Sequence, residues 1–443
     1  MIAGETTTLT IERMSYGPEA IAHTEEGKAV FVLGGVPGDT VAAQIDAEAK
    51  SYAKAHVTEV LEASPSRVVP ACPYVGACGG CPWAALDYAL QAKTKRDGVV
   101  DQLVRVGHMD RDAAEALVAP CESPSEPWGY RNKVELAVTE QSGRVRLGMH
   151  AQSGAGVVNV KTCALLSKRY QGAVKSVAGA LSYLAGSNDL GLERVGIRAS
   201  ARTKDVEVAL WNRPGAFPRA QVAKVLGDAL KPTSVSRVMQ KGPAKARKIA
   251  GVECLSGKGC WEELVAGNRM RVSAPSFFQV NTKGAEKLVE LVLEGLAPQA
   301  HDEAMDLYCG AGTFTVPLAQ RCAYVSAVES YGPAVRDLRR NLEKNNLENV
   351  DAIGGDARRE FPYTDADVIV VDPPRAGLAP EVIEQLCDQP ARAIAYVSCD
   401  PATLARDLAR FIDEGVFAPT RVTPVDLFPQ TFHVETVTIL KRL

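Results

Sequence analysis

The most constraining feature of this chain is a repeated pattern between residues 304 and 399, in which short apolar runs each end at a turn. The four runs begin at Ala304, Tyr324, Val368 and Ala393. Runs of this length are typical of buried parallel strands, and open α/β sheets hold their ligands at the carboxyl ends of such strands. The pattern therefore predicts a doubly wound α/β domain over residues 271–443, with its site along one sheet edge.

A glycine turn follows the first run. The segment DLYCGAGT at 306–313 leads from a strand into a helical stretch, and its glycines allow the backbone to approach a ligand at the amino end of that helix. The third glycine of the dinucleotide fingerprint is missing, because Thr315 stands in its place. This departure argues against NAD and favours a nucleoside-type ligand without a pyrophosphate.

Acidic side chains follow the next three strands. Glu329 comes 23 residues after Asp306, where a carboxylate is well placed to accept both ribose hydroxyl hydrogens. Asp356 is placed to receive an adenine amine, and Asp372 is held in a rigid Pro-Pro turn. Three such acids behind a glycine turn predict an S-adenosylmethionine-binding domain.

Two further side chains at strand ends have no clear role on their own. Cys399 follows the last apolar run, and a cysteine in that position is more often a small core residue than a nucleophile. Glu435 opens an alternating strand near the end of the chain, and an isolated glutamate is usually solvated.

A cysteine cluster lies in the first half of the chain. Cys72, Cys78 and Cys81 are separated by five and then two residues, with a glycine pair between the last two that allows a tight backbone turn around an ion. Cys163 is the best candidate for a fourth ligand. The spacing favours an iron-sulfur cluster over zinc, or over thiols without a ligand. The alternatives for the fourth position are Cys121, Cys254 and Cys260.

The amino-terminal region has a different pattern. Short alternating runs and Gly/Pro turns over residues 5–61 predict a small β-barrel, a fold that often holds oligonucleotides. Residues 63–270 combine short strands and helices, and residues 84–107 suit an amphipathic helix with a basic face. Taken residue by residue, such a face is more often simply that of a solvated helix.

Charge is distributed unevenly. Residues 1–270 hold 33 Lys+Arg against 28 Asp+Glu, whereas residues 271–443 hold 17 against 25, so the net charges are +5 and −8. A polyanion would be held mainly by the first part. The chain has no apolar run of 18 residues and no signal segment at its start, and its eleven cysteines fit a reducing compartment. We therefore expect a cytoplasmic protein without membrane contact.

Taken together, the motifs resemble the bacterial RNA uracil-5-methyltransferases, in particular the ribosomal-RNA branch with an amino-terminal TRAM barrel and a four-cysteine iron-sulfur site. The resemblance covers nearly the whole chain. Besides the cysteine cluster it rests on VPGD at 36–39, SFFQVN at 276–281, DLYCGAGTF at 306–314, VDPPRAGL at 371–378, YVSCDPATLARD at 396–407 and DLFPQTFHVET at 426–436.

The resemblance implies three domains: a TRAM-like RNA-binding β-barrel at 1–62, a central α+β domain with the iron-sulfur cluster and RNA contacts at 63–270, and the methyltransferase domain at 271–443. By similarity, Cys399 is the nucleophile and Glu435 the base. The cofactor site is implied to comprise Gln279, Tyr308, Thr313, Glu329, Asp356 and Asp372. The ligands of a [4Fe-4S] cluster are implied to be Cys72, Cys78, Cys81 and Cys163.

The chain departs from the family pattern in two places. Trp83 and the two alanines after it replace a Gln-His pair that many relatives carry, which affects cluster-side RNA contacts. Thr313 stands where an asparagine is frequent, and this keeps a side-chain oxygen near the cofactor.

The implied reaction is methyl transfer from S-adenosylmethionine to carbon 5 of a uridine in 23S ribosomal RNA, by a monomer. The Cys399 thiolate adds to carbon 6 of the uracil, and we expect nearby backbone amides and donors on the uracil to lower the pKa of this thiol. Transfer RNA as substrate and a non-catalytic RNA-binding protein are the alternatives. A cytosine-5 methyltransferase is disfavoured, because the turn after the fourth strand carries Asp372 and no thiol.

Overall fold

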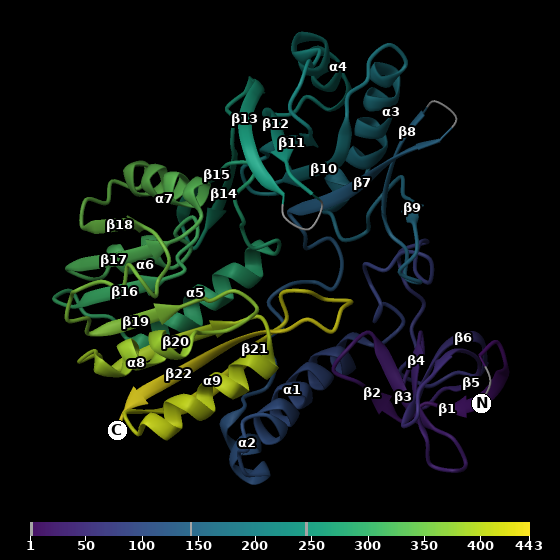
Figure 1. The fold of residues 1–443 in the computed structure, drawn as a ribbon, viewed down its shortest axis with the longest axis horizontal. Coiled ribbons are helices and arrows are strands. Elements are labelled where there is room, and N and C mark those ends of the chain that lie inside the picture. Colours follow the sequence, from purple (N-terminus) through teal and green to yellow (C-terminus); the bar gives the residue numbers. More distant parts are fainter. Residues whose placement is uncertain (1–2, 142–143, 244–246) are drawn as a thin grey trace.

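The computed structural model describes residues 3–141, 144–243 and 247–443, and it contains three sheet-based units (Figure 1). The first is a six-stranded barrel-like sheet with strand order β1-β5-β6-β4-β3-β2. Its alternating side chains close around an apolar core that includes Ile11, Val30 and Ile45, as the sequence predicts. The strands are β1 (Thr6–Thr10), β2 (Arg13–Met14), β3 (Glu19–His23), β4 (Ala29–Leu33), β5 (Thr40–Glu48) and β6 (Tyr52–Glu62).

The second unit is a mixed seven-stranded sheet with order β13-β12-β11-β10-β7-β8-β9. One face is covered by α3 (Ala173–Ala185) and α4 (Arg219–Leu230), which share an apolar core with it. The strands are β7 (Lys133–Gln141), β8 (Arg144–His150), β9 (Val157–Asn159), β10 (Leu192–Ala199), β11 (Val206–Asn212), β12 (Ser234–Lys241) and β13 (Lys248–Gly257). A short 3₁₀ helix spans Lys168–Tyr170.

The third unit is a seven-stranded sheet with order β18-β17-β16-β19-β20-β22-β21. The first five strands in that order are parallel, and β22 runs antiparallel between β20 and β21. The strands are β16 (Glu303–Leu307), β17 (Tyr324–Glu329), β18 (Val350–Gly354), β19 (Val368–Val371), β20 (Ala393–Ser398), β21 (Phe417–Val425) and β22 (Glu435–Arg442). The predicted doubly wound sheet is therefore present.

Helices cover both faces of this third sheet. Ile369 and Val371 of β19 point to one face, and Val368 and Val370 point to the other, as the two-residue period of a strand requires. The helices on the first face are α8 (Pro380–Asp388) and α9 (Pro401–Glu414), and those on the second are α5 (Thr282–Leu296), α6 (Thr315–Ala319) and α7 (Gly332–Lys344). A hairpin of β14 (Trp261–Val265) and β15 (Asn268–Val272) packs beside α7.

Two helices from the first half of the chain also pack on this third unit. In Figure 1, α1 (Tyr88–Arg105) lies beside α9, with α2 (Arg111–Leu117) at its end. Val99 and Leu103 of α1 share the apolar core of α9 and the sheet. Lys95, which belongs to the expected basic face of this helix, is buried and pairs with Asp426 at 2.5 Å. No helix among the described ranges is long and apolar enough to cross a membrane.

Candidate active site

Cys399 and Glu435 meet at the carboxyl edge of the third sheet. The antiparallel register between β20 and β22 ends with Ser398 opposite Thr436. One further step places Cys399 opposite Glu435, the first residue of β22, whose side chain is only 4% exposed. The insertion of β22 beside β20 thus brings together two side chains that are 36 positions apart in the sequence.

The electrostatics of this pair differ from the expectation. Burial raises the pKa of the Cys399 thiol to about 12, and the charges of Glu435, Asp372 and Asp400 add to this effect. Burial and Asp372 also raise the pKa of Glu435 well above its usual range. The expected lowering of the thiol pKa is therefore absent from the free protein, because the sulfur is itself buried and carboxyl groups lie around it.

Beyond Asp372, one more buried carboxyl group, that of Asp306, extends this acidic pocket. Burial raises the pKa of Asp372 to about 7, with contributions from Asp306 and Glu329. The pKa of Asp306 is also raised to about 7 by burial and by Glu329, although the Thr315 hydroxyl, which donates a hydrogen bond to it at 2.6 Å, opposes the shift. Such a pocket is complementary to a cationic ligand.

Two buried side-chain acceptors lack a hydrogen-bond donor in the described part of the chain. The side-chain oxygen Oε1 of Gln279 and Oδ1 of Asp306 are buried and have no hydrogen-bond partner among the residues that the structure describes. Glu329 accepts hydrogen bonds from the amide of Gly310 at 2.9 Å and from that of Tyr331 at 2.6 Å. Buried acceptors without donors are costly, so these residues fit a ligand that carries donor groups and positive charge, as S-adenosylmethionine does.

The remaining residues predicted for the cofactor site lie around the glycine turn. Tyr308 has a left-handed backbone with φ of 65°, an unusual conformation for a residue with a side chain. Burial and the charge of Asp356 raise the pKa of Tyr308 to about 12, so these two side chains are neighbours. Asp356 is exposed and pairs with Arg358 at 3.1 Å, while Thr313 is half-buried at the end of the turn.

The four cysteines of the predicted cluster lie close together. Burial raises the pKa of Cys81 to about 12, and the neighbouring thiols of Cys163, Cys78 and Cys72 raise it further. The amide of Gly80 donates to the sulfur of Cys78 at 3.5 Å. Their charges thus interact, yet within the described residues no group of three or more potential ligands is arranged tightly enough to hold a metal ion. The donor set fits an iron-sulfur cluster in chemistry and number.

The alternative fourth ligands lie elsewhere. Cys121 is next to Asp426 and Lys95, Cys260 is next to Arg271, and Cys254 is exposed on β13.

The structure also places side chains near Cys399 that the sequence did not single out. Arg375 donates to Asp400 at 3.0 Å. Tyr16, from the loop between β2 and β3 of the barrel, is close enough to Asp400, Arg375 and Cys399 for their charges to affect its pKa, which burial raises. Nothing in a local motif signals Tyr16, because its position depends on how the barrel docks. Asp306 was missed because it lies inside its strand.

The sheet order, the glycine turn and the acids at the strand ends define the class of S-adenosylmethionine-dependent methyltransferases. The family model described as tRNA (Uracil-5-)-methyltransferase matches residues 262–443, and the TRAM domain model matches residues 3–58. An uncharacterized RNA methyltransferase of Gloeobacter violaceus is 32% identical over 459 residues, covering 100% of this chain and 98% of the relative. One of Streptomyces avermitilis is 34% identical over 459 residues, covering 99% and 98%.

The chain therefore belongs to the RNA (uracil-5-)-methyltransferase family, and it is an S-adenosylmethionine-dependent enzyme with an amino-terminal TRAM domain. Among solved structures, its fold is similar to that of the Pyrococcus abyssi tRNA (uracil-54, C5)-methyltransferase in complex with S-adenosyl-L-homocysteine. The TM-score is 0.76 at 23% sequence identity, and the match covers 98% of this chain and 100% of the other.

Proposed function

We propose that the enzyme methylates carbon 5 of a specific uridine in 23S ribosomal RNA through a covalent adduct between Cys399 and the uracil. The observation that carries this proposal is the pairing of Cys399 with buried Glu435 beside the acidic pocket. Carbon 5 of uracil is a poor nucleophile until a thiolate has added to carbon 6, so a thiol and a base must reach the same ring.

In the proposed mechanism, the cofactor supplies an electrophilic methyl group when it is bound. The Cys399 thiol loses its proton to solvent, and the thiolate forms a bond to carbon 6 while the double bond between carbons 5 and 6 opens to give an enolate. Carbon 5 of the enolate then takes the methyl group. Glu435 accepts the proton from carbon 5, the bond between sulfur and carbon 6 breaks, and the ring double bond is restored. The raised pKa of Glu435 favours the protonated carboxyl group, so this group must lose its own proton before the third step, and the resulting carboxylate is then a stronger base. We assign cofactor binding to Gln279, Tyr308, Thr313, Glu329, Asp356 and Asp372.

The raised pKa of Cys399 predicts a pH dependence. With a pKa of about 12, the thiolate fraction of the free enzyme rises about tenfold for each pH unit. We therefore expect log kcat/KM for RNA to rise with a slope of at least about 1 between pH 6.5 and 9, because deprotonation of Glu435 adds to that of Cys399. Steady-state methylation measured across this range checks the prediction, and a plateau above pH 8 would contradict it.

The RNA target is tested by mass mapping of 5-methyluridine. We expect cells that lack the protein to lose this nucleoside at a site in 23S ribosomal RNA, and purified enzyme to restore it. Transfer RNA is the second candidate, favoured by the fold shared with a transfer-RNA enzyme. Loss of 5-methyluridine from transfer RNA alone would assign the enzyme to that substrate, and loss from neither RNA would refute the proposed function.

We further propose that Cys72, Cys78, Cys81 and Cys163 hold a [4Fe-4S] cluster. The convergence of four thiols from two segments supports this, together with the nearby Arg131, whose charge opposes the raised pKa of Cys81. Iron and acid-labile sulfide are measured in protein purified without oxygen, and Cys163→Ser is expected to lower both. Zinc in place of iron, or no metal, would contradict the cluster.

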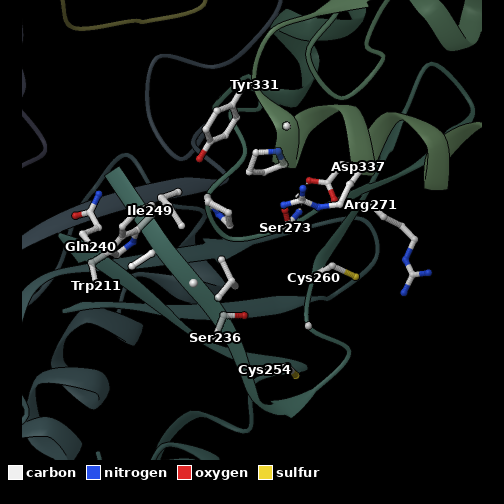
Figure 2. A pocket seen from close by; sticks show the side chains of 18 of the residues that line it. Trp211, Ser236, Gln240, Ile249, Cys254, Cys260, Arg271, Ser273, Tyr331 and Asp337 are labelled. Carbon is white, nitrogen blue, oxygen red and sulfur yellow. Dashed lines mark hydrogen bonds between the residues drawn. The ribbon is translucent and has the colours of Figure 1, made fainter. Parts of the chain in front are cut away.

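We propose that RNA backbone also docks in a cleft of about 1230 Å³ between the second sheet and α7 (Figure 2). Figure 2 shows Trp211 and Ile249 on the side of the sheet and Tyr331 and Asp337 on the side of α7. The basic residues that line it are Arg194, Arg247, Lys248, Lys258, Arg271, Arg336 and Arg340, against a single acid, Asp337. Five of these residues pair with acids, so the positive charge that is complementary to phosphate lies mainly on Lys248 and Arg336.

Lys248 and Arg336 are the best positions to test this cleft, because neither forms an ion pair with another residue that the structure describes. We expect Lys248→Ala and Arg336→Ala each to weaken RNA binding and to reduce the slope of log K against log salt by about 1. Filter binding at several salt concentrations measures this slope. Lys344→Ala, at the exposed far end of α7, is the matched control. Unchanged slopes in both variants would show that the cleft does not bind the RNA backbone.

A further inference from the structure

The loop at residues 426–434 joins β21 to β22 and leads directly into Glu435. Its middle residue, Gln430, is 3% exposed and has a left-handed backbone with φ of 73°. Glu435 itself pairs with Val425 in the ladder between β22 and β21, and the loop determines how the chain enters this ladder. In Figure 1 the loop projects from the sheet toward the barrel and the first helix.

A reciprocal pair of glutamines holds the loop at its middle. The backbone amide of Gln430 donates to Oε1 of Gln91 on α1 at 2.9 Å, and Nε2 of Gln91 donates to Oε1 of Gln430 at 3.0 Å. Nε2 of Gln430 donates to the carbonyl of Pro127 at 3.2 Å. Both side chains are buried, so removal of either leaves unpaired polar groups away from water.

The same pair is bonded to the cysteine segment. Nε2 of Gln91 lies 3.2 Å from the carbonyl oxygen of Trp83 and 2.9 Å from that of Leu86. The amide of Trp83 donates to the carbonyl of Gln430 at 3.0 Å. Trp83 follows Cys81 by two residues, and its ring nitrogen donates to Gly17 of the barrel at 3.1 Å. A continuous set of hydrogen bonds thus runs from the cysteine segment to the loop.

The start of the loop has a separate anchor. Nζ of Lys95 pairs with Asp426 at 2.5 Å and donates to the carbonyl of Phe428 at 3.1 Å. Tyr130 donates to the carbonyl of Pro429 at 3.1 Å. These contacts fix the side of the loop near β21, and the glutamine pair fixes its middle. The side near Glu435 has hydrogen bonds within the loop, such as that from the His433 amide to the Thr431 hydroxyl at 3.3 Å.

We propose that the Gln91–Gln430 pair is a positioning device that links the cysteine segment to Glu435 and serves the proton-removal step. This inference rests on the proposed function. If Glu435 is displaced, the sulfur of Cys399 still adds to carbon 6 and carbon 5 still takes the methyl group. The proton on carbon 5 then leaves slowly, so the bond between sulfur and carbon 6 persists and the methylated adduct accumulates.

The test uses the full-length enzyme in Gln91→Met, which keeps the side-chain length and removes the amide. With S-adenosylmethionine labelled in its methyl group and the RNA identified by mapping, we expect turnover to fall about tenfold. The fraction of enzyme in a denaturant-stable, methyl-labelled RNA adduct should rise at the same time. Gln430→Asn should act in the same direction, because asparagine tolerates a positive φ while its shorter side chain loses the hydrogen bonds to Gln91 and Pro127 and keeps only that of the backbone amide. The double variant should be no worse than either single one.

Gln299→Met is the matched control, since Gln299 is exposed and remote from the loop. It should leave turnover and adduct level unchanged, and cofactor binding should be equal in all variants. Lower turnover without added adduct, or unchanged turnover, would overturn the inference. If both pair variants fail to fold in thermal unfolding, the pair serves stability and the inference is also overturned. If the proposed function itself is wrong, the result differs from all of these, because the wild-type enzyme then makes no 5-methyluridine.

Discussion

Replacing Cys399 by alanine is expected to lower kcat for 5-methyluridine formation by at least about 10⁴-fold. The reason is chemical: without the sulfur, no bond forms at carbon 6, and carbon 5 of the uracil remains too weak a nucleophile to take the methyl group. Incorporation of labelled methyl groups into substrate RNA measures the loss, and the denaturant-stable adduct should disappear with it.

The Cys399→Ala substitution should affect catalysis without affecting folding. Cysteine and alanine are similar in size, so Cys399→Ala should retain its thermal unfolding temperature and its binding of S-adenosylmethionine. Cys387→Ala, which alters a buried thiol in α8 away from the sheet edge, is the matched control and should remain active. Substantial activity in Cys399→Ala would reject the covalent mechanism and leave the family membership untouched.

The acids at the strand ends could be predicted from the sequence for a simple physical reason. The runs before Glu329 and Asp372 are short and apolar, and parallel strands buried on both faces place the residue after each run at one common edge. The pattern is local, so it can be recognised without knowledge of tertiary contacts. The apolar alternation of the barrel and the glycine turn were predictable on the same grounds.

Tertiary contacts decide the features that the sequence could not reveal. Lys95 looked like part of a basic helix face, yet it is buried against Asp426, which lies 331 positions later. The approach of Glu435 to Cys399 depends on β22 pairing between β20 and β21, and an alternating strand does not specify its place in a sheet. The raised pKa of Cys399 has the same origin, since it follows from burial in the folded chain and from carboxyl groups on three different segments.

Glu435→Gln is expected to convert the enzyme into one that methylates once and then stays bound to its RNA. The substitution keeps the shape of the buried side chain and removes the base, and loss of a general base typically costs 10²- to 10⁴-fold in turnover. It also removes a negative charge that raises the pKa of Cys399, so addition to carbon 6 should not be impaired.

The measurement is a single-turnover reaction in which the RNA carries one label and the methyl group of S-adenosylmethionine carries another. The protein–RNA species is separated from free RNA under denaturing conditions. In Glu435→Gln the protein–RNA species should carry close to one methyl group per RNA and persist, whereas in the wild type it should be transient. Glu414→Gln, at the exposed end of α9, should behave as wild type. An adduct without the methyl group would mean that Glu435 acts before methyl transfer. The absence of any adduct would show that Glu435 is not the base that removes the proton, because that step can stall only after both bonds to the uracil ring have formed.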